Sequence, residues 1–119
     1  MSDNVIKTKS FSFALRIVKL YQFLSVEKKE FVLSKQLLRS GTAIGALVSE
    51  AEHAESKLDF IHKLAIAQKE ANETNYWLQL LYQSEYLNET QFQSLNSDIA
   101  EINKILASII ITTKQNHKK

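Results

Sequence analysis

Two pairs of the form Glu/Asp-x-x-His are the residues of this chain whose types and spacing come closest to metal chemistry. Glu50 and His53 stand three residues apart, and so do Asp59 and His62. On a helix this spacing places both ligands on one face, as in carboxylate-bridged di-metal bundles. Those bundles hold the motif in mid-helix facing inward, whereas both pairs here flank a predicted turn between helices. We therefore predict no metal site and interpret both histidines as surface residues.

A second acidic pair, Glu70 and Glu73, has the one-turn spacing that general acid–base catalysis can use. Carboxylates one turn apart on a helix are more often ion-pair partners, here of Lys63, Lys69 or a neighbouring subunit. No serine has a His and an Asp in a plausible order for nucleophilic activation. The chain has no cysteine, which excludes thiolate nucleophiles, thiolate metal sites and disulfides. We predict a protein that is not an enzyme and has no cofactor.

The composition predicts that long helices in one domain carry these side chains. The chain has 119 residues, of which 45% are hydrophobic and 24% charged, with no proline and two glycines. This length suits a single domain over residues 1–119, and the scarcity of helix breakers favours an all-α fold. No apolar run approaches the roughly 20 residues that span a bilayer, and the N-terminus lacks an apolar signal core. We expect a cytoplasmic protein with no membrane contact.

Apolar residues recur with helical periodicity in four segments. The predicted helices cover about residues 10–26, 31–54, 57–85 and 90–114. Val18 is expected to widen the core stripe of the first helix, and Ser40 and Thr74 fall on the stripes of the second and third. Short connections between such helices favour an antiparallel up-down-up-down four-helix bundle.

Two helix starts carry capping signals. Ser56 followed by Asp59 has the spacing of a capping box, with aspartate in place of the usual Glu or Gln. Asn88 and Thr90 are both candidates to cap the fourth helix. These signals place the turns between the second and third helices and between the third and fourth.

Gly41 and Gly45 lie four residues apart, on one side of the second predicted helix. Each glycine costs roughly 1 kcal/mol of helix propensity relative to alanine. Close approach of another backbone explains why glycine is tolerated there. We expect tight packing of a neighbouring helix against this side.

The charges are segregated along the chain, although the net charge is only +2. Residues 1–39 hold eight Lys/Arg and three acids (+5), residues 40–101 three and ten (−7), and residues 102–119 four and none (+4). Cations of the first two helices could form one basic stripe that meets phosphate backbones without reading sequence. These cations are Lys9, Arg16, Lys19, Lys35 and Arg39. The alternative is a solvated surface of mixed charge.

The third predicted helix carries a second cluster beside its core stripe. The cluster consists of Ile66, Glu70, Glu73, Trp77 and Leu80. Tryptophan is enriched among interface residues that carry binding energy, so this cluster could pack against another copy of the chain. The alternative is a wide intramolecular face, in which Trp77 packs against the first or fourth helix.

Three sequence segments are more particular than bundle periodicity requires: SFSFALRIVKLYQFL, LLRSGTAIGALVSEA and SKLDFIHKLAIAQKEANETNYWLQLL. With the last amphipathic helix, they make nearly the whole chain similar to the four-helix-bundle proteins encoded by intervening sequences in bacterial 23S rRNA genes, also called S23 ribosomal proteins. The resemblance implies a ring-like homopentamer without known catalysis. It also implies a distant likeness to the accessory protein of diversity-generating retroelements, a basic pentameric bundle that binds nucleic acid and a reverse transcriptase.

Two functional hypotheses follow from the residues and the resemblance together. In the first, a homo-oligomer of this chain is an accessory factor that binds the backbone of RNA or DNA. In the second, the oligomer is a structural scaffold for a protein partner and has no nucleic-acid role. A binding affinity that falls steeply with salt distinguishes the first from the second.

Overall fold

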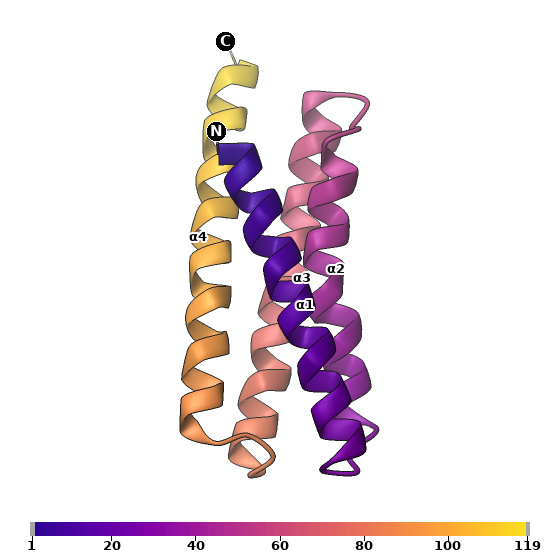
Figure 1. Ribbon diagram of the computed structural model, residues 1–119. Helices are drawn as coiled ribbons and strands as arrows, with labels where there is room; N and C mark the ends of the chain where they lie inside the picture. Colours follow the sequence, from indigo (N-terminus) through magenta and orange to yellow (C-terminus); the bar gives the residue numbers. More distant parts are fainter. Residues whose placement is uncertain (1, 119) are drawn as a thin grey trace.

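The computed structural model describes residues 2–118, with side chains from Val5 to His117. Over this range the chain forms four α-helices and no strand: α1 (Ser2–Val26), α2 (Leu33–Ala51), α3 (Lys57–Gln83) and α4 (Glu89–Lys118). Successive helices run antiparallel and side by side (Figure 1). This arrangement confirms the predicted all-α four-helix bundle. None of the described helices is long and apolar enough to cross a membrane.

Two of the predicted helix ends were wrong by more than one helical turn. α1 begins at Ser2 instead of about residue 10, and Ile6 in this early part is only 2% exposed. The periodicity missed this part because Ser10, which is also buried, is a polar residue in the core stripe. α4 continues to Lys118 instead of ending at about residue 114.

The core is built from aliphatic side chains of all four helices. Fully buried members include Ile17 of α1, Ile44 of α2, Leu78 of α3 and Leu106 of α4. Each such side chain contributes about 1.5–3 kcal/mol by its removal from water. Val18 is 37% exposed, so the expectation that it widens the core stripe was wrong. α1 meets α2 through the side that carries Ile17 and leaves Val18 facing outward.

One polar contact crosses the core between α2 and α3. The hydroxyl oxygen of Thr74 lies 2.9 Å from that of Ser40, and both residues are fully buried. The Thr74 hydroxyl is also 2.8 Å from the carbonyl oxygen of Glu70, one turn earlier. Both predicted stripe positions are therefore buried, and their hydroxyl groups are hydrogen-bonded, which avoids the cost of an unpaired polar group.

Gly41 and Gly45 lie where α1 packs closely on α2. A Cβ atom on Gly41 would be 2.9 Å from two side-chain carbons of Ile17. A Cβ atom on Gly45 would be 3.2 Å from the carbonyl oxygen of Ser10. These distances confirm the predicted close packing, and they fix the point at which α1 crosses α2.

The bundle has two unlike ends (Figure 1). One end, here called the two-turn end, holds the α1–α2 and α3–α4 connections. The other, the single-turn end, holds the α2–α3 connection, the start of α1 and the end of α4. Side-chain caps stabilise the turns at both ends.

At the two-turn end, the carboxylate of Glu30 caps α2. It accepts hydrogen bonds from the backbone N–H groups of Val32, Leu33 and Ser34 at 3.0, 2.9 and 2.7 Å. Burial raises the pKa of Glu30, but these hydrogen bonds together outweigh it and hold the pKa below its ordinary value. The preceding residue, Lys29, has a left-handed φ of 57°, which turns the chain into the cap.

Side-chain caps begin α3 and α4, and the cap of α4 is reciprocal. The Ser56 hydroxyl accepts from the Asp59 N–H at 3.0 Å, which confirms the predicted cap. At α4 the Asn88 side chain accepts from the Gln91 N–H at 2.8 Å, and the Gln91 side chain accepts from the Asn88 N–H at 2.9 Å. Asn88, and not Thr90, is therefore the cap of α4.

Candidate interaction surfaces

The two acid–histidine pairs surround the α2–α3 turn, as predicted, and do not converge on one point. Glu50 forms an ion pair with Lys63 at 3.4 Å. Asp59 accepts a hydrogen bond from the backbone N–H of Glu55 at 3.2 Å, so its carboxylate helps to hold the turn. Across the part of the chain that the structure describes, no group of three or more His, Asp or Glu side chains could hold a metal ion.

Glu70 and Glu73 of α3 are bridged by a cation of α2. The Arg39 guanidinium lies 3.1 Å from a Glu70 oxygen and 2.6 Å from a Glu73 oxygen. Glu73 also accepts a hydrogen bond of 2.9 Å from the indole N–H of Trp77. The predicted ion pairing is therefore present, but its cation is Arg39 and not Lys63 or Lys69.

This network shifts the pKa values of Arg39 and Glu73. Hydrogen bonds to Glu70 and then Glu73 raise the pKa of Arg39 above its ordinary value. The Trp77 hydrogen bond and then the Arg39 hydrogen bond hold the pKa of Glu73 below its ordinary value, against a smaller opposing effect of burial. A carboxylate that is ionised and paired in this way is poorly suited to act as a general acid near neutral pH.

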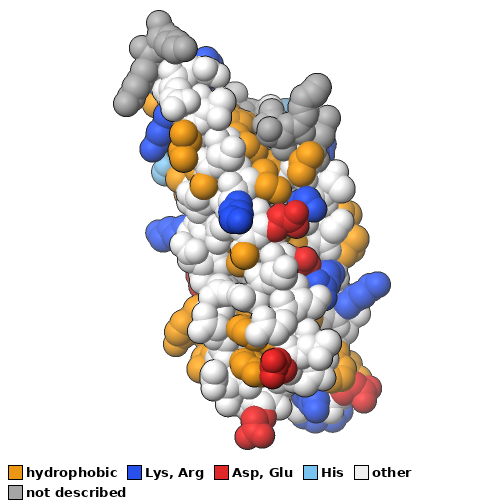
Figure 2. Space-filling model, turned by 90° about the vertical axis from the view of Figure 1, so that its left-hand side faces the viewer, with side chains coloured by type: hydrophobic (Ala, Val, Ile, Leu, Met, Phe, Trp, Pro, Cys, Tyr) orange, Lys and Arg blue, Asp and Glu red, His pale blue; other side chains and the backbone are white. Residues whose placement is uncertain are grey.

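Two more of the predicted phosphate-binding cations pair with acids of α4. Arg16 lies 2.6 Å from Asp98 and donates a second hydrogen bond of 2.9 Å to the Ser94 hydroxyl. Lys9 lies 3.2 Å from Glu101. Figure 2 looks onto the α4 side, where basic and acidic side chains alternate with apolar ones and form no single basic patch.

The five predicted cations do not form one stripe. Arg16 of α1 contacts α4, whereas Arg39 of α2 contacts α3. Each helix packs against the next in the order α1, α2, α3, α4 and back to α1, so the α1–α4 and α2–α3 contacts lie on opposite sides of the bundle. Lys19 and Lys35 are exposed on α1 and α2 and make no ion pair with the described side chains. The sequence could not reveal this division, because helical periodicity does not say which neighbouring helix a polar residue meets.

Exposed cations that the sequence analysis did not select lie in the α1–α2 turn. Lys28 and Lys29 are exposed there, between Lys19 near the end of α1 and Lys35 in the first turn of α2. The one nearby buried acid, Glu30, is occupied by the N–H groups of α2. We call Lys19, Lys28, Lys29 and Lys35 the turn lysines. The adjacent pair Lys28–Lys29 in a predicted turn was the sequence signal that could have identified them.

Three apolar side chains of α1 point away from the core. Phe11, Leu15 and Val18 are 64%, 51% and 37% exposed and are spaced by four and three residues, so they form one outward stripe. Apolar residues on two sides of one predicted helix were the sequence signal for this outer stripe, which was not recognised. Large exposed apolar side chains gathered in this way mark contact surfaces.

The predicted cluster on α3 is only half exposed. Trp77 is partly buried against the core, and Ile66 and Leu80 also have intermediate exposure. Tyr76, next to Trp77 with its ring edge-on at 5.1 Å, is 58% exposed. Trp77 packs partly against the core beside the Arg39–Glu73 ion pair of α2 and α3, and within the described residues no hydrogen bond or ring stacking joins it to the first or fourth helix. The interface interpretation of this cluster stays a prediction.

Fold and surfaces together define a small antiparallel four-helix-bundle protein whose surface is made of ion pairs and outward apolar stripes. The sequence profile of the 23S rRNA-intervening sequence protein family matches residues 2–108, and the chain belongs to this family. The predicted resemblance is thereby confirmed, and the family's description names no reaction.

A solved structure supports the same assignment. It is the crystal structure of a protein with unknown function from the S23 ribosomal protein family of Bacteroides thetaiotaomicron VPI-5482. The two chains are 63% identical, the match covers 92% of this chain and 98% of that one, and the TM-score is 0.92. A search of functionally curated proteins found no match.

Proposed function

We propose that this protein acts without catalysis, as a homo-oligomer that binds the phosphate backbone of RNA or DNA. The outer stripe of Phe11, Leu15 and Val18 is the observation that carries the proposal. A lone chain leaves these side chains 64%, 51% and 37% exposed, and their burial against another copy would stabilise an assembly by about 25 cal/mol per Å² of apolar surface.

A second apolar region suits the other half of such a contact. It lies on α3 and comprises Tyr76 with the half-buried Ile66, Trp77 and Leu80. Two different contact regions on one chain favour a head-to-tail arrangement, which closes into a ring when the rotation between copies allows it. A ring of five is the state that the family resemblance implies, and we include it in the proposal.

The turn lysines support contact with a phosphate backbone. Lys19, Lys28, Lys29 and Lys35 are exposed cations near one end of the bundle, and Lys9, Arg16 and Arg39 are engaged with acids. A single chain would therefore bind weakly, and repetition around an oligomer would multiply the contact. The affinity should fall steeply with salt because bound phosphates release counterions.

Light scattering after gel filtration tests the assembly. We expect a mass several times the 13.6 kDa of one chain. Leu15→Glu or Ile66→Glu should lower the mass while circular dichroism stays helical, because each places a charge in an apolar contact. Ser12→Glu, an exposed change on α1 outside the outer stripe, is the control and should leave the mass unchanged. A wild-type mass of one chain at every concentration would remove the oligomer from the proposal.

Fluorescence anisotropy with labelled RNA and DNA oligonucleotides, titrated with salt, tests the binding. Charge reversal at two of the turn lysines, Lys28→Glu together with Lys29→Glu, should remove binding. Arg16→Glu should weaken it less, because Arg16 already pairs with Asp98. Lys69→Glu on α3 is the control.

Absence of binding even at low salt would instead favour the alternative, a scaffold for a protein partner. The ion pairs of Lys9, Arg16 and Arg39 support this alternative, because these cations are already bound to acids of the same chain. The oligomer test does not depend on the outcome, because the outer stripe contributes to assembly under either function.

A further inference from the structure

A cavity opens at the single-turn end because α1 and α2 separate there. The two helices touch at Gly41 and Gly45. Toward its N-terminus α1 then lies beside α4 (Figure 1), while α2 continues to Ala51 and the turn into α3. The space between them has a volume of about 630 Å³. Sites for small molecules typically measure about 300–1,000 Å³.

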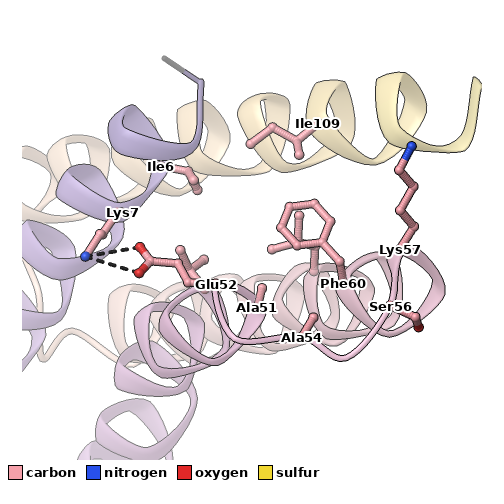
Figure 3. Close-up of a pocket in the computed structure, with 11 residues that line it drawn as sticks. Ile6, Lys7, Ala51, Glu52, Ala54, Ser56, Lys57, Phe60 and Ile109 are labelled. Atoms are coloured by element: carbon pink, nitrogen blue, oxygen red, sulfur yellow. Dashed lines mark hydrogen bonds and ion pairs between the residues drawn. The ribbon is translucent and has the colours of Figure 1, made fainter. Parts of the chain in front are cut away.

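Apolar side chains form the inner wall of this cavity, and polar and charged side chains form its rim (Figure 3). The larger apolar lining residues are Ile6 of α1, Val48 of α2, Phe60 and Leu64 of α3, and Ile109 of α4. All but Phe60 are at most 7% exposed, so they form a fixed part of the core. This inner wall favours an alkyl chain, and any polar group of the same ligand would have to lie at the charged rim, where it can be paired.

Charged side chains border the cavity and indicate the sign of the charge that its ligand should carry. Lys7 of α1 pairs with Glu52 at 3.1 Å (Figure 3). Lys57, at the start of α3, extends toward α4 in Figure 3 and forms no ion pair with the described side chains. Two lysines and one glutamate give the lining a net charge of +1. This charge is complementary to a single negative charge.

We propose that this cavity binds a linear alkyl carboxylate of roughly six to ten carbons. The alkyl chain lies against Phe60 and Leu64, and the carboxylate accepts hydrogen bonds from the Lys57 ammonium. Each methylene that becomes buried raises the affinity roughly fourfold until the chain fills the cavity. The site requires neither the proposed assembly nor the proposed nucleic-acid contact.

Isothermal titration calorimetry on the full chain tests the site, with hexanoate, octanoate and the neutral analogue octanol below the concentrations at which they aggregate. We expect one site per chain and an affinity for octanoate roughly fifteenfold above that for hexanoate, because two methylenes are added. Octanol should bind roughly tenfold more weakly than octanoate, since it lacks the charge that pairs with Lys57.

Variants assign the binding to this cavity. Lys57→Met should lower the octanoate affinity roughly tenfold and abolish the preference over octanol. Lys69→Met, an exposed lysine of the same helix away from the cavity, is the matched control and should bind as the wild type. Ala54→Phe should remove binding, because the ring occupies the cavity that Ala54 borders.

Methyl chemical shifts of the wild-type chain keep the test independent of how Ala54→Phe folds. Octanoate should shift the methyl signals of Ile6, Leu64 and Ile109. Shifts confined to Leu15 and Val18 would place the ligand on the outer stripe and overturn the proposal. It is overturned equally by the absence of saturable heat, or by a loss of affinity in Lys69→Met as large as in Lys57→Met.

Discussion

At the two-turn end, the helices are joined by core contacts around a smaller hollow, whereas at the single-turn end the same helices separate around a larger cavity. Leu24 and Leu87 are almost fully buried at the two-turn end, and the rings of Tyr82 and Phe92 stack at 4.6 Å between α3 and α4. A hollow of about 400 Å³ at this end is lined by Lys28 and, from the core side, by Phe23 and Leu87. The single-turn end has the larger cavity of about 630 Å³, with the apolar core as its inner wall.

The difference follows from one contact. Because Gly41 and Gly45 bring α1 against α2, the helix axes are closest at that crossing and diverge beyond it. Toward the two-turn end the short α1–α2 connection limits the divergence, but no such connection joins the start of α1 to α2. A bundle of this kind can therefore carry a larger space at one end than at the other.

Two leucine substitutions, one at each end, should give the largest losses of stability and test the difference in packing between the ends. Leu24→Ala at the two-turn end should cost about 3–5 kcal/mol, because it leaves an enclosed void. Leu64 borders the existing cavity. Leu64→Ala should therefore lower the free energy of unfolding by less, about 2–3 kcal/mol, because the volume it vacates joins a space that is already open. Both residues are at most 1% exposed, so initial burial is matched. Urea unfolding followed by circular dichroism checks the order, and equal costs would contradict the difference between the ends.

Glu30→Gln should lower the free energy of unfolding by about 1–2 kcal/mol at pH 7, because a neutral amide replaces a carboxylate that accepts three backbone N–H groups. The pKa of Glu30 is lower in the folded chain than its ordinary 4.5. The stabilisation is therefore complete above about pH 4.5 and is lost as the pH falls through the folded pKa.

Unfolding experiments at several pH values check the Glu30 prediction. The wild type and Glu30→Gln should converge in stability under acid conditions. A constant difference down to pH 2 would show that the carboxylate charge is not the source of the effect. Glu27→Gln, an exposed glutamate in the same turn, is the control.

The helix caps of the two ends should have similar energies. Asn88→Ala at the two-turn end and Ser56→Ala at the single-turn end should each cost about 1 kcal/mol, since each removes one side-chain cap. Thermal unfolding of both variants checks this. Similar costs would show that the two ends differ in how their helices pack and not in how their turns are capped. A cost at one end only would show that the turns themselves differ in stability.

The smallest effect is expected for Lys7→Met. Its ion pair with Glu52 spans the single-turn end at 3.1 Å, but both side chains are more than a third exposed. Such pairs contribute about 0.2–1 kcal/mol and are screened by salt. Denaturation at low and high salt should show a difference from wild type only at low salt. A larger loss would mean that the ion pair, and not packing, holds this end together.

The sequence was sufficient for features that depend on residues close together in the chain. The Ser56 cap, the four helices and the close contact at Gly41 and Gly45 follow from local chemistry and helical periodicity. The pairing of Arg16 with α4 and of Arg39 with α3 did not follow. Those contacts depend on the rotation and relative shift of whole helices, which no single helix encodes.

The cavity was missed for a related reason. Its wall residues, such as Ile6 and Ile109, have the same apolar character as fully packed core residues. Whether such residues meet one another or line a space depends on the direction in which α1 leaves its contact with α2. The buried Ser10 further obscured the first part of α1 in the sequence pattern.

Trp77 gives the α2–α3 contact its own optical reporter. It is the single tryptophan of the chain, and its indole donates to Glu73, which Arg39 also binds. Ultraviolet emission from this one fluorophore therefore senses whether these two helices remain joined. Acidification below the ordinary carboxyl value of 4.5 should change the emission as Glu73 takes up a proton, before the backbone loses its helical signal.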